Sequence, residues 1–414
     1  MVKNQVQAGN FSLIKKMNMS LILDVIRQKG PISRSEIAVY TNLTPATITN
    51  ITAELIDEKL IMEAESGESK GGRRPIMLRM RTDYYRVIGM YIGSKKIEII
   101  ASDLMANIKY RKEVTFERGE MSEQEGISLI RSEVKYIVDN YNKKGKKVLG
   151  IGIGIHGLVD TKKGISIFAP NLGWKDIKLK EIIESEFGIP VYVDNDARTL
   201  ALGESWFGTG KNISNFFCLN VEYGVGGSLV IDNKIFRGAS DGAGELGHTT
   251  VDINGEECAC GNRGCLETVA SVKALRRMAY EGYLQKRESS IFECKEINSR
   301  SDIKAKDIFS AANNGDQFAI EIIKKVGENL GIGVANVINT FNPQLVIING
   351  EIITTGEILL DSIRETVVKR SFNRSFRSTE IVLSKLGSLA YLKGAVVLAI
   401  QDIFANPESI HSIA

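Results

Sequence analysis

One histidine and three cysteines are spaced in the sequence as the ligands of a metal ion would be. His248 closes the run Gly244-Glu-Leu-Gly-His248, and Cys258, Cys260 and Cys265 follow in a glycine-rich loop. One imidazole and three thiolates complete the tetrahedron of a structural zinc site. The alternatives are a catalytic zinc, which needs an open coordination position, and three unligated thiols clustered by chance. We predict structural Zn2+ on these four residues.

A second set of side chains suits a ligand with many hydroxyl groups. Amides and carboxylates are planar polar groups that can each bond two hydroxyls. If zinc takes one ring nitrogen of His248, the other can donate to a ligand hydroxyl. Taken singly, Asn and Asp are also ordinary loop residues, so their clustering depends on the fold. The loop candidates are Asn171, Asp194, Asn195, Asp196 and Glu245.

The elements that must position these residues alternate between strands and helices. We predict strands at 87–93, 97–103, 148–155, 191–196, 216–221, 227–231 and 345–350, and helices at 122–141 and 327–339. This alternation is typical of an α/β fold, in which ligands bind at the carboxyl ends of strands. Glycine turns at 91–95 and 224–227 suggest two phosphate-binding loops. Two such loops on an α/β body resemble the two-lobed architecture of sugar kinases, actin and heat-shock ATPases.

The first eighty residues have the pattern of a winged helix-turn-helix. Apolar residues at helical spacing predict a helix over 13–26, which Gly30-Pro31 ends. Ser33 and Glu36 form a capping box for a short second helix, and Thr44 with Pro45 opens a third helix that runs to about residue 59. Two short strands, at 60–63 and 75–79, flank the segment 66–74, which we interpret as the wing.

The third helix of this module presents small polar residues to DNA. The N-terminal residues of a recognition helix enter the major groove, where Thr and Asn can bond base edges or phosphates. No Lys or Arg occurs from Ser35 through Glu58, so attraction to phosphates must come from elsewhere. A winged helix used only for protein contacts is the alternative. The predicted DNA-binding residues are Arg34, Thr44, Thr47, Thr49, Asn50, Lys70, Arg73 and Arg74.

Composition places the chain of 414 residues among ordinary globular proteins, with a net charge of +3. The excess positive charge lies in residues 1–81, which hold 12 Lys and Arg against 8 Asp and Glu. On charge alone this fits either a nucleic-acid-binding head or a solvated face with a chance imbalance. No apolar run reaches the roughly 20 residues that span a bilayer, and the first 30 residues lack a signal peptide, so we expect a cytoplasmic protein. We expect ordinary thiols at Cys218 and Cys294.

Together these motifs resemble the ROK family (repressor, open reading frame, kinase), in the branch that carries an N-terminal winged helix. The segment from Gly238 to Glu267 is the most specific, and 152–160, 171–174 and 195–197 are also similar. The head, with Gly71-Gly-Arg-Arg-Pro75, is similar to those of xylose repressors and N-acetylglucosamine repressors. The resemblance implies a two-lobed, actin-like α/β body behind the head, and the zinc site above. The sugar contacts that it implies are Asn171, Asn195, Asp196, Glu245, His248 and Glu267.

Three segments depart from the pattern of the family's kinases, in which ATP is the donor and the residue matching Asp196 is the general base. Their first phosphate loop reads Asp-x-Gly-Gly-Thr, whereas Tyr91-Ile-Gly-Ser-Lys95 lacks the Asp, the second Gly and the Thr. In the second loop, Tyr223 stands where the kinases have Thr. Phosphoryl transfer depends on positioning and on a metal that neutralises charge, so we predict no efficient kinase activity. His156 stands where the family usually has Pro, and the resemblance implies no role for it.

We therefore predict a sugar-responsive transcriptional repressor of carbohydrate-utilisation genes. Its effector would be a monosaccharide of the xylose, glucose or amino-sugar class, bound in an interlobe cleft. A homodimer, or a dimer of dimers, would bind a palindromic operator in double-stranded DNA. The alternatives are an ATP-dependent sugar kinase with an appended DNA-binding head, and a repressor controlled by a partner protein. The expected domains are a head at 1–81, a small lobe at 82–196 completed by a helix at about 387–405, and a large lobe at 197–386 with the zinc site and the dimerisation surface.

Overall fold

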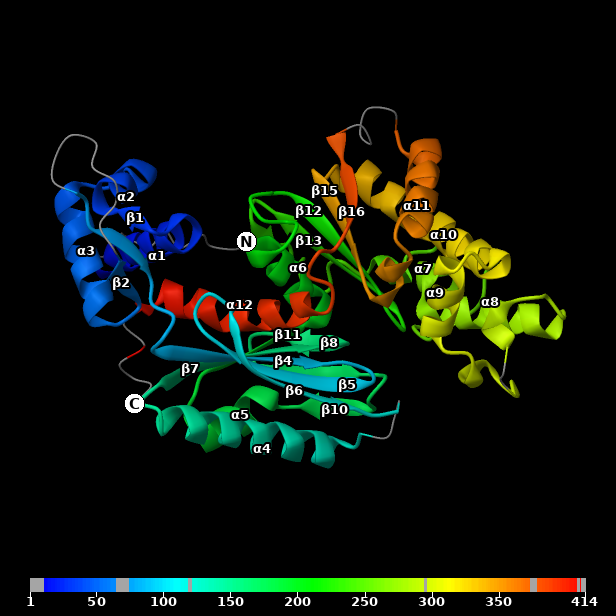
Figure 1. The fold of residues 1–414 in the computed structure, drawn as a ribbon, viewed down its shortest axis with the longest axis horizontal. Helices are drawn as coiled ribbons and strands as arrows, with labels where there is room; N and C mark the ends of the chain where they lie inside the picture. Colours follow the sequence, from blue (N-terminus) through cyan, green and yellow to red (C-terminus); the bar gives the residue numbers. More distant parts are fainter. Residues whose placement is uncertain are drawn as a thin grey trace, which may run out of the picture. The chain divides into compact units, whose positions relative to one another are not determined.

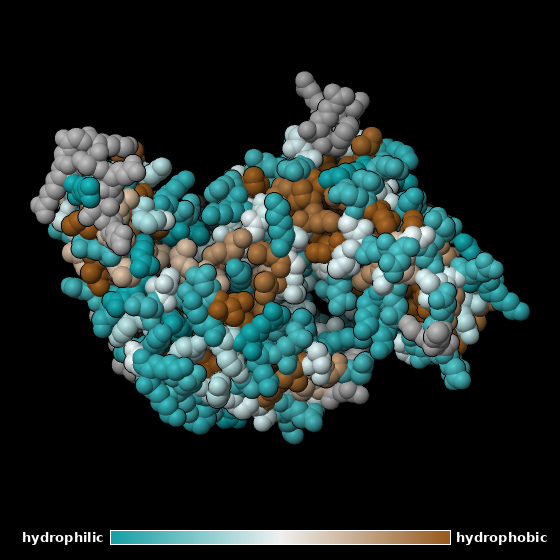
Figure 2. All heavy atoms as spheres, in the orientation of Figure 1, coloured by the Kyte–Doolittle hydropathy of each residue, from teal (hydrophilic) through white to brown (hydrophobic). Residues whose placement is uncertain are grey.

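A computed structural model of the chain describes residues 11–64, 74–117, 121–293, 296–372, 378–407 and 410 (Figure 1). The chain divides into two compact units, one made of residues 1–194 with 395–414 and the other of residues 195–394. On the face drawn in Figure 2, hydrophilic residues predominate and hydrophobic ones form separate groups. Across the residues described, no helix is both long and apolar enough to cross a membrane.

The N-terminal part of the first unit combines three helices with a small antiparallel sheet in the order β1-β3-β2. As predicted, Ser33 and Glu36 form a capping box at the start of the second helix, and Thr44 caps the third. The predicted helix-turn-helix is therefore present, whereas residues 65–73, most of the expected wing, lie outside the described residues. The elements are α1 (Phe11–Lys29), β1 (Ile32–Ser33), α2 (Arg34–Thr41), α3 (Pro45–Asp57), β2 (Ile61–Ala64) and β3 (Met77–Met80).

The rest of the first unit is built on a mixed five-stranded sheet in the order β11-β7-β4-β5-β6, beside a three-stranded sheet in the order β10-β9-β8. The strands are β4 (Tyr85–Ile92), β5 (Lys96–Ser102), β6 (Ile108–Thr115), β7 (Lys147–Ile155), β8 (Leu158–Asp160), β9 (Ile165–Ala169), β10 (Trp174–Ile177) and β11 (Val191–Asn195). The helices are α4 (Glu123–Asn142), α5 (Leu179–Phe187) and, from residue 395 onward, α12 (Leu389–Ala405). Every residue of β4 is buried, which accounts for the apolar run from Val87 to Ile92. The buried charge in this strand, Arg86, donates to the backbone carbonyls of Thr82 and Tyr85.

Glycines alternate with isoleucines in β7 because the C-terminal helix packs directly on this strand. A Cβ at Gly152 would overlap the carbonyl oxygen of Ala395, and one at Gly150 would lie 3.0 Å from the Cβ of Ala399. The glycine pattern of this strand therefore has a packing role.

The second unit is built on a five-stranded sheet in the order β14-β13-β12-β15-β16. Its strands are β12 (Phe216–Val221), β13 (Val225–Ile231), β14 (Lys234–Ile235), β15 (Leu345–Asn349) and β16 (Glu380–Leu383). Its α-helices are α6 (Asp196–Phe207), α7 (Leu266–Ala270), α8 (Val272–Leu284), α9 (Ala305–Asn313), α10 (Gln317–Phe341) and α11 (Glu357–Arg370). Short 3-10 helices are η1 (Leu246–His248), η2 (Ser290–Phe292), η3 (Arg300–Asp302) and η4 (Glu351–Thr355).

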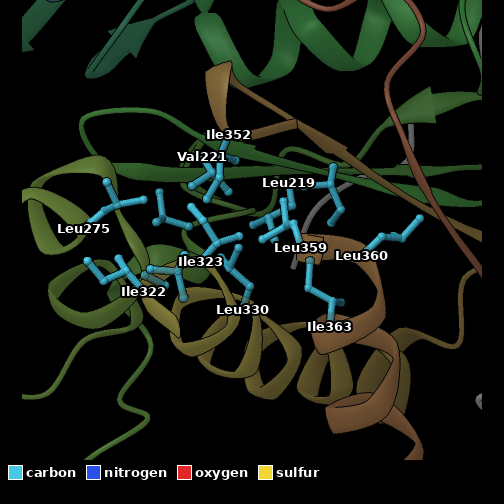
Figure 3. Close-up of a cluster of buried hydrophobic side chains, with 14 of the residues drawn as sticks. Leu219, Val221, Leu275, Ile322, Ile323, Leu330, Ile352, Leu359, Leu360 and Ile363 are labelled. Carbon is cyan, nitrogen blue, oxygen red and sulfur yellow. The ribbon is translucent and has the colours of Figure 1, made fainter. Parts of the chain in front are cut away.

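The core of the second unit lies between β12 and the helices α10 and α11. Figure 3 shows Leu219 and Val221 of the strand facing Ile323 and Leu330 of α10. The two helices approach closely because α10 has glycine where it meets α11. A Cβ at Gly327 would lie 2.6 Å from the Cβ of Ser362. The predicted helix at 327–339 was too short, since α10 begins ten residues earlier with an amphipathic stretch.

Candidate functional site

The four predicted metal ligands lie together in the second unit. The ligand atoms of His248, Cys258, Cys260 and Cys265 all lie within 4.8 Å of one another. Nδ1 of His248 is 3.7 Å from Sγ of Cys258, and Sγ of Cys260 is 3.8 Å from Sγ of Cys265. Tetrahedral zinc, with bonds of about 2.3 Å to sulfur and about 2.0 Å to nitrogen, separates two sulfurs by about 3.8 Å and sulfur from nitrogen by about 3.6 Å. Both separations therefore fit a zinc-sized ion.

Backbone hydrogen bonds and a glycine fold the cysteine loop back on itself. The N–H of Cys258 donates to the carbonyl of Asn262 over 2.7 Å, and the N–H of Gly264 donates to the carbonyl of Glu256 over 2.8 Å. Gly264 has a φ of +69°, and a Cβ there would overlap the carbonyl oxygen of Asp252. Only glycine meets both requirements, so this residue is needed to bring Cys265 back to the other ligands.

The thiols differ in how easily they ionise. Burial raises the pKa of Cys258, and raises that of Cys265 to about 12, whereas the backbone N–H of Asn262 lowers the pKa of Cys260. A buried thiol of this kind stays protonated near pH 7 unless a cation stabilises the thiolate. Cys218 lies apart in β12, where burial raises its pKa well above the usual value, and Cys294 lies outside the described residues.

Five of the six predicted sugar contacts lie around the first residues of β13, against which α6, η1 and α7 pack. Glu267 of α7 accepts a hydrogen bond from the backbone N–H of Val225 over 3.0 Å. Gly247 of η1 lies so close that a Cβ would overlap the carbonyl of Val225, and a Cβ at Gly226 would lie 3.5 Å from that of Ala197 in α6. The residues that these contacts bring to one region are Asn195, Asp196, Glu245, His248 and Glu267.

Asn195 and Asp196 stand at the N-terminus of α6. The side-chain Oδ1 atoms of both residues accept from the backbone N–H of Ala197 over 2.9 Å. Burial raises the pKa of Asp196 to about 6, against the opposing effects of that N–H and of Arg198. Among the described residues, Oδ2 of Asp196 has no hydrogen-bond partner, so it is available to a ligand hydroxyl.

The sixth predicted sugar contact, Asn171, belongs to the first unit. Its backbone N–H donates to Nε2 of His156 over 3.2 Å, and His156 is buried directly after β7. Sequence reasoning assigned His156 no role, because this bond depends on how the ends of two strands meet. The signal available was that His156 is one of only three histidines and follows a buried strand.

An aromatic ring covers the first of the two expected phosphate loops. The N–H of Gly93 donates to the carbonyl of Lys96 over 2.9 Å and closes a tight turn between β4 and β5. Tyr91 is buried, and a Cβ at Gly93 would lie 2.6 Å from its hydroxyl oxygen. The ring therefore occupies space beside the glycine, where a phosphate would need open N–H groups. Lys95 points its amine to within 3.8 Å of Glu117.

The N-terminal half of α3 exposes the polar residues predicted to meet DNA. Thr44, Thr49 and Asn50 are exposed, while Ile48 is buried. The hydroxyl of Thr49 donates to the carbonyl of Pro45 over 2.8 Å. The hydroxyl groups of Thr44 and Thr47 form a hydrogen bond with each other over 2.9 Å. Within the described part of the chain, the Asn50 side chain forms no hydrogen bond. Of these polar residues of α3, it is therefore the one most available to bond with DNA.

The basic residues predicted to meet phosphates differ in their surroundings. Arg34 donates to the hydroxyl of Thr52 over 3.0 Å and forms an ion pair with Glu63 over 3.3 Å, so part of its guanidinium is already engaged. Arg74 is exposed. Lys70 and Arg73 lie outside the described residues.

Comparisons with known proteins agree on one family. Residues 87–402 match the model of the ROK family. The chain is 37% identical over 400 residues to the xylose repressor of Caldicellulosiruptor bescii (97% of this chain, 99% of the relative). It is 33% identical over 411 residues to the DNA-binding transcriptional dual regulator NagC of Escherichia coli (97% and 99%). The predicted resemblance to xylose and N-acetylglucosamine repressors is confirmed.

Two solved structures show the fold. A ROK family transcriptional regulator, a homologue of the E. coli MLC protein, superposes with a TM-score of 0.84 at 30% identity (96% of this chain, 100% of that chain). A ROK family glucokinase from Streptomyces griseus, in complex with glucose and AMPPNP, superposes with a TM-score of 0.67 at 31% identity (76% and 98%). The predicted α/β fold, with a helical N-terminal region before a two-lobed sugar-kinase-like body, is confirmed.

Proposed function

The chain belongs to the ROK family, and on that premise we propose that it is a DNA-binding transcriptional repressor whose effector is a monosaccharide. The observation that carries the proposal is the full-length match to a xylose repressor, which includes the helix-turn-helix as well as the body. The exposed N-terminal half of α3 supports it, because it presents Thr44, Thr49 and Asn50. A gel-shift titration with the promoter fragments of sugar-utilisation genes tests it. No retention of any fragment at low salt would contradict it.

The proposed assembly follows from the symmetry of operators. Two heads, residues 1–81 of each chain, would read the half-sites of a palindrome from a homodimer or a dimer of dimers in the cytoplasm. Residues 197–386 would form the large lobe and carry the dimerisation surface. Residues 82–196, with a C-terminal helix at about 387–405, would form the small lobe. Sedimentation with and without operator DNA measures the stoichiometry.

We assign a structural zinc ion to His248, Cys258, Cys260 and Cys265. The four donors fill a tetrahedron, so the ion would supply rigidity rather than an open catalytic position. His248 presents Nδ1 to the cysteines, which leaves Nε2 to donate to a sugar hydroxyl. The ion would thus fix the orientation of one proposed sugar contact.

The proposed effector binds where Asn195, Asp196, Glu245, His248 and Glu267 meet. Xylose, glucose and N-acetylglucosamine represent the three sugar classes to be screened by thermal shift. A binding sugar raises the Tm through its preferential binding to the folded state. That same sugar must change operator affinity, because an effector acts only through its differential affinity for two states. A sugar that binds without changing operator affinity would contradict the regulatory role.

Sugar phosphorylation is the second candidate function. Asp196, with a raised pKa and a free Oδ2, has the properties of a general base, and the glucokinase at 31% identity favours this reading. The ring of Tyr91 at Gly93 opposes it, because it takes the place of an acidic ligand for Mg2+. A coupled ATP-consumption assay with the three sugars decides between them. Turnover at 1–100 per second, the order usual for kinases, would favour the enzyme.

A further inference from the structure

A cationic cavity lies beside the proposed zinc and sugar residues, entirely within the second unit. Its volume is about 290 Å³, close to the lower limit for small-molecule sites. The start of α8, the cysteine loop and η3 form its walls, and Glu267 and Cys258 line it from the site described above. Four cationic side chains, Lys273, Arg276, Arg277 and Arg300, line it as well.

Three of these cations, Lys273, Arg276 and Arg300, form no close ion pair with a described residue, although Arg276 also interacts electrostatically with Asp302. Arg277 pairs with Glu256 and lies 3.6 Å from Glu281, so it is neutralised locally. In the described part of the chain, no carboxylate forms an ion pair within 4 Å of Lys273, Arg276 or Arg300. Glu256 and Glu267, two of the three lining carboxylates, are already engaged by Arg277 and by the N–H of Val225. Four cations and three carboxylates line the cavity, so the lining residues carry a net charge of +1 (4 − 3).

Arg276 is held in place as a preformed donor. One of its terminal nitrogens donates to the carbonyl of Arg300 over 3.0 Å, which fixes the guanidinium plane. Its Nε is buried and has no hydrogen-bond partner among the residues described. A buried donor without an acceptor is unfavourable, and such groups in native proteins often mark the place of a bound water or ion.

The N-terminus of α8 adds a second, independent preference for anions. Ser271 caps this helix of 13 residues by accepting from the N–H of Ala274 over 3.2 Å, and both residues line the cavity. The partial positive charge of a helix N-terminus favours anions, and phosphates above all. Guanidinium groups match the geometry of phosphate oxygens.

We propose that this cavity binds a small phosphate-bearing molecule, held by Lys273, Arg276, Arg300 and the start of α8. The site lies beside the proposed sugar contacts and shares Glu267 with them. Its occupancy would thus be sensed by the sugar site through one carboxylate, and this coupling rests on the function proposed above. Phosphate binding itself does not depend on that function, and its test needs neither DNA nor sugar.

Calorimetric titration of the full chain with inorganic phosphate and with methyl phosphate, at constant ionic strength, tests the proposal. We expect at least one of them to bind with a Kd of about 1 mM or lower. The double variant K273Q/R300Q removes two exposed charges and should weaken binding at least about tenfold, and Arg276→Gln should do the same. The matched control K234Q/K324Q removes two exposed charges of the same unit away from the cavity and should change the Kd by less than about twofold.

Tighter binding of methyl phosphate would identify a phosphate ester as the ligand, and tighter binding of inorganic phosphate would identify the free ion. Three results would overturn the proposal. The first is that neither probe binds at a concentration of 10 times the expected Kd, and the second is that K273Q/R300Q binds phosphate with the same Kd as the native chain. The third is that malonate binds as tightly as phosphate, which would show a site for anions in general.

Discussion

The backbone N–H of Asn171 donates to Nε2 of the buried His156 over 3.2 Å. Because Nε2 accepts this bond, it carries no proton, and the ring holds its proton on the other nitrogen. His156 follows β7 and Asn171 follows β9, so the bond links the ends of strands that belong to two different sheets of the first unit. His156, which departs from the family pattern, is thus hydrogen-bonded to Asn171, the sixth predicted sugar contact.

Replacing His156 by Phe should weaken sugar binding. The variant leaves the N–H of Asn171 without its acceptor, and a lost hydrogen bond of about 1 kcal/mol corresponds to roughly fivefold in Kd. Calorimetry with the sugar found by thermal shift measures the change. His156→Gln keeps an acceptor and should bind nearly as well as the native chain. Equal sugar affinity in His156→Phe would show that this bond does not position Asn171.

Replacing Cys260 by Ser should release the metal. Cys260 is exposed, so its thiol adds little packing, and a fall in stability would reflect the missing ligand. We expect zinc content to drop well below one ion per chain by mass spectrometry, and the Tm to fall by about 5–10 °C. Cys218→Ala, which alters a thiol outside the cluster, should keep its zinc. Full metal content in Cys260→Ser would remove Cys260 from the ligand set.

Replacing Asn50 by Ala should reduce operator affinity without affecting binding to random DNA. A side chain that reads a base edge contributes about 1–3 kcal/mol to discrimination, and Asn50 is exposed with no competing bond in the described structure. Gel shifts with operator and scrambled duplexes measure both affinities. Ala53→Ser, on the exposed side of the same helix, is the control. A parallel loss on both duplexes would mean that Asn50 contacts the backbone only.

Replacing Arg73 and Arg74 together by Ala should flatten the salt dependence of DNA binding. Each phosphate contact contributes a slope of about −0.9 in log affinity against log salt, so losing two should reduce the slope by about 2. Fluorescence anisotropy from 50 to 200 mM salt measures it. The double variant Lys324→Ala with Lys325→Ala removes equal charge from the body and should keep the slope. An unchanged slope in the wing variant would place the wing away from DNA.

Replacing Asp196 by Asn should remove a pH-dependent loss of stability. Burial raises the pKa of Asp196 to about 6, so the folded chain holds this proton more tightly than the unfolded chain. The stability from that proton is complete below about pH 4 and is lost as the pH rises through about 6. The Tm of Asp196→Asn relative to the native chain should therefore rise between pH 4 and 7, by about 2–4 °C. Asp232→Asn, which makes the same substitution at an exposed position of the second unit, is the matched control.

What the sequence predicted correctly depended on short-range chemistry. The capping box of Ser33 and Glu36 and the cap at Thr44 involve residues three positions apart, so local pattern is sufficient to find them. The metal cluster was found for the same reason, because three of its four ligands lie within eight residues. The seven strands predicted for the body correspond to β4, β5, β7, β11, β12, β13 and β15, because each has a pronounced hydrophobic run, whereas β6, β8, β9, β10, β14 and β16 were not predicted.

The features that the sequence did not predict depend on contacts between distant segments. The bond from Asn171 to His156 requires the ends of β7 and β9 to meet, and the cationic cavity requires η3 to lie beside α8. The position of the Tyr91 ring at Gly93 depends on a rotamer that sequence spacing does not specify. The start of α10 was not predicted because the helix was identified by its glycines and alanines. These small residues occur only in the part of α10 that packs on α11.

The chain leaves the first unit after residue 194 and returns to it at residue 395. Because the glycines of β7 leave room for Ala395 and Ala399, the face of the sheet on which α12 packs stays uncovered until residues 395–405 are synthesised. During translation the second unit can therefore fold while this face of the sheet is still exposed to solvent. A ribosome that stops early would release a chain with an open apolar sheet, which makes premature termination a direct route to aggregation for this protein.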